Sequence, residues 1–262
     1  FPYTTLFRSI AALALEAGVS EPTVNRFCRS LETRGFPDFK LHLAQSLAHG
    51  TLYVNRNVDE DDSVESYTGK IFESAMASLD QVHHSLDMSA VNRAVDLLTQ
   101  AKKIAFFGLG SSAAVAHDAM NKFFRFNVPV IYSDDIVLQR MSCMNCDDDD
   151  VVVIISHTGR TKSLVELAQL ARENDAMVIA LTSAGTPLAR EATLAITLDV
   201  PEDTDIYMPM VSRLAQLTVI DVLATGFTLR RGAKFRDNLK RVKEALKESR
   251  FDKELLIKSN DS

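Results

Sequence analysis

Between residues 91 and 229, short apolar runs alternate with longer stretches in which apolar residues recur at helical spacing. Each short run is apolar at nearly every position, which is typical of a strand buried on both faces. Such strands alternate with helices in parallel sheets that helices cover on both sides. The sequence therefore predicts an α/β fold with a parallel five-stranded sheet flanked by helices. The expected strands are residues 104–107, 128–132, 151–155, 178–181 and 194–198.

Two of these strands run directly into turns rich in glycine and hydroxyl side chains, at residues 108–112 and 156–161. In a parallel sheet such turns lie at the carboxyl ends of the strands, where ligands bind. Each turn also precedes a predicted helix, whose N-terminal N–H groups favour an anion. The sequence thus predicts a phosphate-binding cradle, with simple helix capping as the alternative. The residues assigned to this cradle are Gly110, Ser111, Ser112, Ser156, His157, Thr158, Gly159 and Thr161.

The first turn lacks the fingerprint of a dinucleotide-binding protein. That pattern requires a third glycine three positions after Gly110, where Ala113 stands, and an acidic residue that closes the second strand. Asp134 and Asp135 lie beyond the end of that strand, and no Walker sequence is present. We therefore expect no cofactor.

Residues 1–50 show two short helical patterns around a tight turn at Gly18. Ser9 is expected to cap the first helix and Ser20 the second, with Val19 as an apolar plug between them. The side chains expected to face inward are Ile10, Leu13, Ala14, Ala17, Val24, Phe27, Cys28, Leu31, Phe36 and Phe39.

The polar side chains of the second helix suit the recognition of DNA bases. In helix-turn-helix proteins the N-terminal part of the second helix enters the major groove. There asparagine binds adenine and arginine binds guanine. An ordinary helical hairpin with a polar solvent face is the alternative. The residues assigned to DNA binding are Ser20, Glu21, Thr23, Asn25, Arg26 and Arg29.

The distribution of charge is uneven along the chain. The 262 residues include 29 basic and 35 acidic side chains, and the net charge of −6 speaks against a nucleic-acid partner for the chain as a whole. Residues 1–50 alone, however, carry a net charge of +1. Because this segment has no broad basic patch, we expect affinity to need two such domains on one DNA.

Differences in composition and in hydrophobic pattern along the chain predict four segments. Residues 1–50 form a helix-turn-helix DNA-binding domain, and residues 51–90 an acidic and helical linker. Residues 91–229 form the ligand-binding α/β domain, and residues 230–262 a basic C-terminal helix and tail. In that last helix the expected inward side chains are Phe235, Leu239, Val242 and Leu246.

Several features that could suggest other functions have simpler explanations. The four aspartates at 147–150 precede a strand, so they should form a solvated turn far from the cradle. Cys143 and Cys146 lack the second pair of ligands that a zinc site needs, so we expect no metal. The odd count of three cysteines fits a reducing cytoplasm. No apolar run reaches the length of a membrane helix, and no export signal is evident.

The motifs together resemble one family. The sequence at 108–112, paired with 156–163 and followed by 182–183 and 186–189, resembles the SIS (sugar isomerase) domain. With the helix-turn-helix, the chain resembles an RpiR-family transcriptional regulator over roughly residues 9–250, and the stretches at 121–126, 134–137 and 139–143 add to the likeness.

The resemblance implies a repressor of central carbon metabolism. In that family the SIS domain binds a phosphorylated sugar acid rather than isomerising it. The implied effector is 2-keto-3-deoxy-6-phosphogluconate, and the implied contacts are Ser112 and Ser156. The resemblance further implies that the effector releases DNA. A two-fold operator would call for a homodimer or a homotetramer.

The start of the chain departs from the family pattern. RpiR-family regulators carry a further helix before the helix-turn-helix pair, whereas residues 1–8 lack its length and pattern. We therefore expect an all-α N-terminal domain that is truncated.

Two other functions remain open from the sequence. A sugar-phosphate isomerase of the SIS fold would need a base, for which His157, His117, Glu166 or Glu202 could serve. Such an enzyme would have no need of residues 9–50. A sensor that acts on a protein partner is the third possibility, and it would show no salt-dependent DNA binding.

Overall fold

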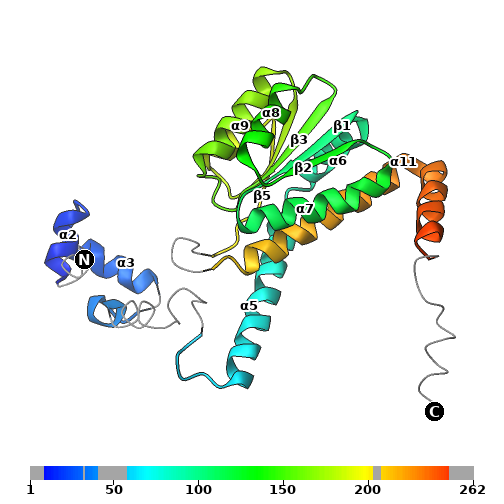
Figure 1. The fold of residues 1–262 in the computed structure, drawn as a ribbon. Helices are drawn as coiled ribbons and strands as arrows, with labels where there is room; N and C mark the ends of the chain where they lie inside the picture. The colour runs from blue at the N-terminus through cyan, green and yellow to red at the C-terminus, as the bar shows by residue number, and fades with distance from the viewer. Residues whose placement is uncertain (1–8, 32, 41–57, 203–207, 248–262) are drawn as a thin grey trace, which may run out of the picture. The chain divides into compact units, whose positions relative to one another are not determined.

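The structure, a computed structural model, describes residues 9–31, 33–40, 58–202 and 208–247 (Figure 1). The described residues form two compact units, one from residues up to 71 with Met208, the other from residues 72–202 and 209–247. The expected truncation concerns residues 1–8, which lie outside the described residues. No helix of the described part is long and apolar enough to cross a membrane.

The first unit contains the predicted pair of short helices, α2 (Ile10–Glu16) and α3 (Glu21–Ser30). The Ser9 hydroxyl accepts a hydrogen bond from the Ala12 N–H at 3.1 Å, which caps α2. Gly18 adopts a φ of +65°, the left-handed conformation that lets the chain turn tightly. The buried core of this pair consists of Ala14, Val24, Cys28 and Phe36.

Part of the predicted apolar stripe is wrong. Phe27 and Leu31 are about half exposed, at 53% and 50%, and Val19 is 42% exposed rather than a buried plug. Ala17 is exposed as well. The reason is geometric, because two short helices bury only the narrow stripe that carries Val24 and Cys28, and residues three positions further along lie on its flank.

The second unit contains the predicted five-stranded parallel sheet. Its strand order is β2-β1-β3-β4-β5, and all four pairings are parallel. Strand β3 is buried along its whole length. The fold class read from the alternation of strands and helices is therefore confirmed. The strands are β1 (Lys103–Phe107), β2 (Val130–Ser133), β3 (Asp150–Ile155), β4 (Met177–Thr182) and β5 (Leu194–Thr197).

Helices cover both faces of this sheet (Figure 1). One face packs against α6 (Met88–Gln100), α7 (Ser111–Phe123) and α11 (Val211–Lys247). The other face packs against α8 (Ile136–Met144), α9 (Lys162–Glu173) and α10 (Pro187–Glu191). Helix α5 (Val64–Ser85) precedes them, and a 3-10 turn (Phe124–Phe126) extends α7.

The predicted basic C-terminal helix is the continuation of α11 past a kink at Gly232, where φ is +75°. Phe235 packs as expected, with its ring 5.6 Å from that of Phe126 and 5.8 Å from that of Phe227. Leu246 is 48% exposed, so its predicted inward position is wrong. The side chains of Leu239 and Val242 lie outside the described residues.

The strand order places a topological switch point between β1 and β3. The helix after β1 lies on one face of the sheet and the helix after β3 lies on the other. Neighbouring strands whose helices leave to opposite faces define a topological switch point, where the two turns diverge and a ligand can enter.

The turn after β3 is held against the turn after β4. The Ser183 N–H donates to the His157 carbonyl at 3.0 Å, and the Leu188 N–H donates to the Gly159 carbonyl at 3.1 Å. Gly159 itself has a φ of +56°, and a Cβ there would lie 2.3 Å from Thr186 Oγ1. The turn can therefore take this form only with glycine at position 159.

We predict that Gly159→Ala destabilises the protein more than Gly185→Ala. Both residues have positive φ, so both alanines incur a backbone strain of about 1–2 kcal/mol. At Gly185 nothing lies within 4 Å of the added Cβ, whereas at Gly159 overpacking adds about 1–3 kcal/mol. Urea denaturation of the two variants measures the difference, and equal losses would contradict this packing.

Candidate functional site

The two predicted serines lie at the switch point between β1 and β3, after the ends of these strands. Ser112 is 8% exposed and Ser156 is 5% exposed. Phe107 and Ile154 are register partners near the ends of their strands, so the two turns begin side by side. The structure thus brings together the two segments that the sequence assigned to one cradle.

The described helices that begin at this switch point lack a side-chain cap. Neither Gly110, the N-cap of α7, nor Thr161, the N-cap of α9, makes a side-chain capping hydrogen bond. By contrast, Asp87 caps α6, Asp135 caps α8 and Thr186 caps α10. The N–H groups of Ser112, Ala113 and Leu164 donate to backbone carbonyls instead. The N-terminal ends of α7 and α9 thus keep the positive end of the helix dipole, which favours an anion.

The remaining cradle residues surround the two serines. Ser111, His157 and Thr158 are half-buried, Gly159 is buried, and Gly110 and Thr161 are exposed. The Ser156 hydroxyl accepts a hydrogen bond from the Gly159 N–H at 3.2 Å, which closes the turn on itself.

Three groups near the cradle are not assigned from the sequence. Thr182 and Thr186 lie against Gly159, and the sequence marks them only as part of the family motif. Gln139 of α8 is fully buried and donates to the carbonyls of Gly108 and Ser133. The only signal for it in the sequence was a polar residue on the same helical face as Ile136 and Cys143.

Glu202 is the third such residue, and it acts as a cap. Its carboxylate accepts hydrogen bonds from the backbone N–H groups of Met210, Val211 and Ser212 at 2.6, 2.8 and 3.1 Å, and from the Ser212 hydroxyl. Burial opposes ionisation, but these hydrogen bonds prevail and lower the pKa of Glu202. Its main-chain carbonyl lies 3.3 Å from His157 Nε2, which links this cap to the cradle.

The candidate bases of an isomerase do not assemble. Glu202 is held as a cap, and Glu166 forms an ion pair with Arg140 at 3.2 Å. His117 is exposed, and the centroid of its ring lies 4.9 Å from that of Tyr132 in a tilted arrangement. Of the four candidates, only His157 belongs to the cradle.

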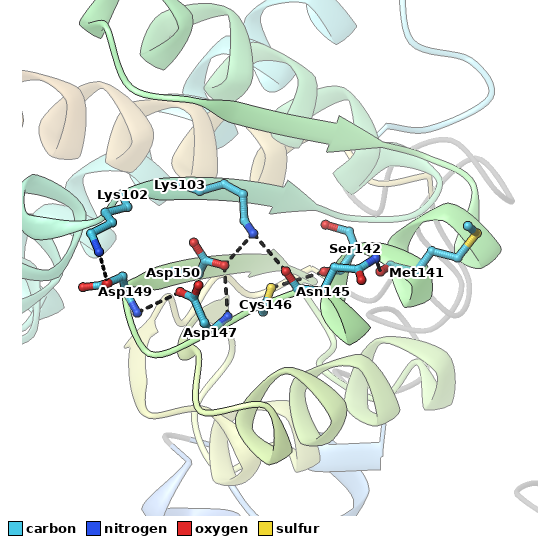
Figure 2. A network of polar contacts seen from close by, with 9 residues as sticks. All are labelled: Lys102, Lys103, Met141, Ser142, Asn145, Cys146, Asp147, Asp149 and Asp150. Atoms are coloured by element: carbon cyan, nitrogen blue, oxygen red, sulfur yellow. Dashed lines mark hydrogen bonds and ion pairs between the residues drawn. The ribbon is translucent and has the colours of Figure 1, made fainter.

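The aspartate run at 147–150 lies at the amino end of the sheet, as expected, and Figure 2 shows its contacts. Asp147, Asp148 and Asp149 are exposed, but Asp150 is buried, so the prediction of a solvated turn is wrong for this residue. Asp150 opens β3 as the register partner of Lys103, and their ion pair measures 2.5 Å. Pairing with the ammonium group is what allows its carboxylate to be buried.

The neighbouring thiols are unpaired. All three cysteines lie within the described residues and none forms a disulfide. Burial raises the pKa of Cys143 to about 12, and it also raises that of Cys146. Both therefore remain protonated thiols near neutral pH.

The residues assigned to DNA lie at the start of α3 and along it. Ser20, Glu21, Arg26 and Arg29 are exposed, whereas Thr23 and Asn25 are half-buried. Ser20 stands at the N-cap position without a capping hydrogen bond, and its hydroxyl lies 2.9 Å from that of Thr23. Thr23 also accepts a hydrogen bond from the Arg26 guanidinium at 3.2 Å. These contacts gather polar groups at the N-terminal end of α3.

Comparison with known proteins matches both units. Residues 2–50 match the helix-turn-helix domain of the rpiR family, and residues 97–226 match the SIS domain. Among solved structures, Vibrio vulnificus NanR complexed with ManNAc-6P has a TM-score of 0.66 at 24% identity, covering 96% of this chain and 90% of that one. The sugar isomerase domain of an RpiR transcription factor from Sphaerobacter thermophilus has a TM-score of 0.59 at 18% identity, covering 68% of this chain and 98% of that one.

Curated relatives are much closer in sequence. The HTH-type transcriptional regulator HexR of Escherichia coli strain K12 is 90% identical over 260 residues, which are 99% of this chain and 90% of that protein. HexR of Pseudomonas aeruginosa is 58% identical over 243 residues, 93% of this chain and 85% of that protein. These relatives are regulators, so the isomerase alternative is set aside. The chain belongs to the RpiR family of transcriptional regulators, in which a helix-turn-helix domain is joined to an SIS domain.

Proposed function

We propose that this regulator is a repressor whose SIS domain binds a phosphorylated sugar acid, 2-keto-3-deoxy-6-phosphogluconate, and that the bound effector lowers its affinity for operator DNA. The observation that carries the proposal is the pair of uncapped helix ends at the switch point, each beside a buried serine, Ser112 or Ser156. Donors arranged in this way suit a phosphate.

The ligand class is supported by chemistry and by a relative. Buried hydroxyls that form charge-assisted hydrogen bonds recognise an anion more strongly than a neutral group. The NanR structure of similar fold holds ManNAc-6P, a phosphorylated sugar. We extend that ligand class to this chain and specify a sugar acid, with contacts from residues 110–112, 156–159 and Thr161.

For DNA, we propose that α3 enters the major groove of a two-fold operator in the cytoplasm, with Arg26 reading a base. A homodimer or homotetramer would present two such helices about one DNA turn apart.

The proposed segments are residues 1–50 for DNA binding, 51–90 as linker, 91–229 for the effector and 230–262 as tail. An effector that binds one arrangement more tightly than the other shifts DNA affinity, and DNA shifts effector affinity in return.

Replacing the two cradle serines tests the effector site. We expect Ser112→Ala and Ser156→Ala each to weaken effector binding about tenfold or more, because a hydrogen bond to a charged group is worth about 1.5–3 kcal/mol. Calorimetry with 2-keto-3-deoxy-6-phosphogluconate measures the loss. Ser78→Ala, at another buried serine, is the control and should bind like the wild type. A double variant with an unchanged effector response would show that the cradle lies elsewhere.

Replacing Arg26 tests the DNA-binding surface. We expect Arg26→Ala to lower operator affinity by about 1–3 kcal/mol, which a lost contact with a base costs. Fluorescence anisotropy with an operator selected by the wild-type chain provides the measurement. Arg172→Ala in α9 is the control. Wild-type affinity should also fall with salt, at a log–log slope of about −0.9 per phosphate neutralised. Unchanged binding by Arg26→Ala would remove α3 from the interface.

A further inference from the structure

We infer that Gln139 is a positioning residue for the effector site, because its amide holds the turn after β1 in place. The inference rests on the proposed function, in which that turn binds the effector. Gln139 lies on α8, is fully buried, and does not belong to either of the turns that form the cradle.

The contacts of Gln139 join two strand ends. Its Nε2 donates to the Ser133 carbonyl at 2.7 Å and to the Gly108 carbonyl at 3.2 Å. Ser133 ends β2 and Gly108 directly follows β1, so one side chain bridges the carboxyl ends of two neighbouring strands. The bridge reaches the glycine that begins the cradle.

The end of the bridge at α8 is firmly anchored. The Asp135 carboxylate caps this helix by accepting hydrogen bonds from the N–H groups of Val137 and Leu138, at 2.8 and 2.9 Å. The Asp135 N–H in turn donates to the Ser133 hydroxyl at 3.0 Å. Cys143, one turn further along the helix, is fully buried against the sheet. Gln139 therefore extends from a fixed support.

The other end of the bridge is a turn that contains two glycines. The turn contains Gly108 and Gly110, and glycine has more backbone freedom than any other residue. The first turn of α7 packs so closely that a Cβ on Gly108 would lie 2.7 Å from the Ser112 carbonyl oxygen. Because a trans peptide is planar, holding the Gly108 carbonyl toward α8 also sets the direction of the Leu109 N–H, away from α8. Gln139 thus fixes the orientation of the peptide group between Gly108 and Leu109, which leads into α7.

The unused half of the amide argues against a role in packing alone. With Nε2 facing two carbonyls, the orientation of the amide is determined, since Oε1 in that place would be repelled. Oε1 is buried and has no hydrogen-bond partner among the described residues. A buried unsatisfied oxygen costs free energy that an apolar side chain of the same shape avoids. A methionine would fill the space as well, so what glutamine adds is its two donated hydrogen bonds.

The test compares Gln139→Met with Gln216→Met in the full-length chain. Gln216 is an equally buried glutamine on α11, which makes it a matched control. We expect Gln139→Met to weaken the binding of 2-keto-3-deoxy-6-phosphogluconate about tenfold in calorimetry, with operator affinity in the absence of effector unchanged within about twofold. Gln216→Met should leave effector affinity at the wild-type value. Effector affinity within about twofold of wild type for Gln139→Met would overturn the inference.

Hydrogen exchange supplies a readout that needs no effector. Amides of residues 108–115 should exchange faster in Gln139→Met than in the wild type, and they should not change in Gln216→Met. Unchanged exchange in Gln139→Met would overturn the positioning role. If the wild type fails to bind the sugar acid, the proposed function fails, and the exchange rates still decide whether Gln139 orders the turn.

Gln139→Glu is the second variant, and it covers the case in which methionine prevents folding. Its protonated carboxyl can still donate one hydrogen bond, whereas the ionised form repels both carbonyls. Effector affinity relative to the wild type should therefore fall as the pH rises from about 5 to about 8. A ratio that stays constant over this range would count against the donated hydrogen bonds.

Discussion

The second unit is arranged around strand β3, all six residues of which are buried. The backbone N–H and C=O groups of a strand covered on both faces must form their hydrogen bonds within the sheet. Strand β3 does so by pairing with β1 on one side and β4 on the other. The strand order then sends the helix after β1 to one face and the helix after β3 to the other. The switch point between their turns is a consequence of this order, in which β3 lies at the centre of the sheet.

The two ends of the sheet use polar groups in opposite ways. At the amino ends, Lys103 and Asp150 form an ion pair, which neutralises both charges at the edge of the core. At the carboxyl ends, α7 and α9 begin without side-chain caps beside Ser112 and Ser156. Charge is therefore neutralised at the amino ends, and the positive ends of two helix dipoles remain at the carboxyl ends, where an anion would bind. Gln139 also lies at the carboxyl ends, where it is buried like a core residue and holds the first turn of the cradle.

Sequence patterns predicted the strands well because each depends on local composition. The apolar runs differ from the observed strands by only one or two residues at their ends, and both Gly-rich turns follow the strands from which they were expected. The pattern was less reliable for α3, where Phe27 and Leu31 were expected inside and are half exposed. Periodicity shows which face of a helix is apolar, but it does not show how much of that face a small partner can cover.

The sequence by itself determined the α/β class, the two turns of the cradle and the polar face of α3, because these follow from residue type and spacing. Tertiary structure alone decided the strand order, the burial of Asp150 by Lys103, the capping role of Glu202 and the bridge from Gln139 to Gly108. Except for the Glu202 cap, whose partners are eight to ten residues away, each of these depends on contacts between residues far apart in the chain. Spacing along the sequence does not show which distant groups will come into contact. Those contacts decide whether a buried polar side chain has a hydrogen-bond partner.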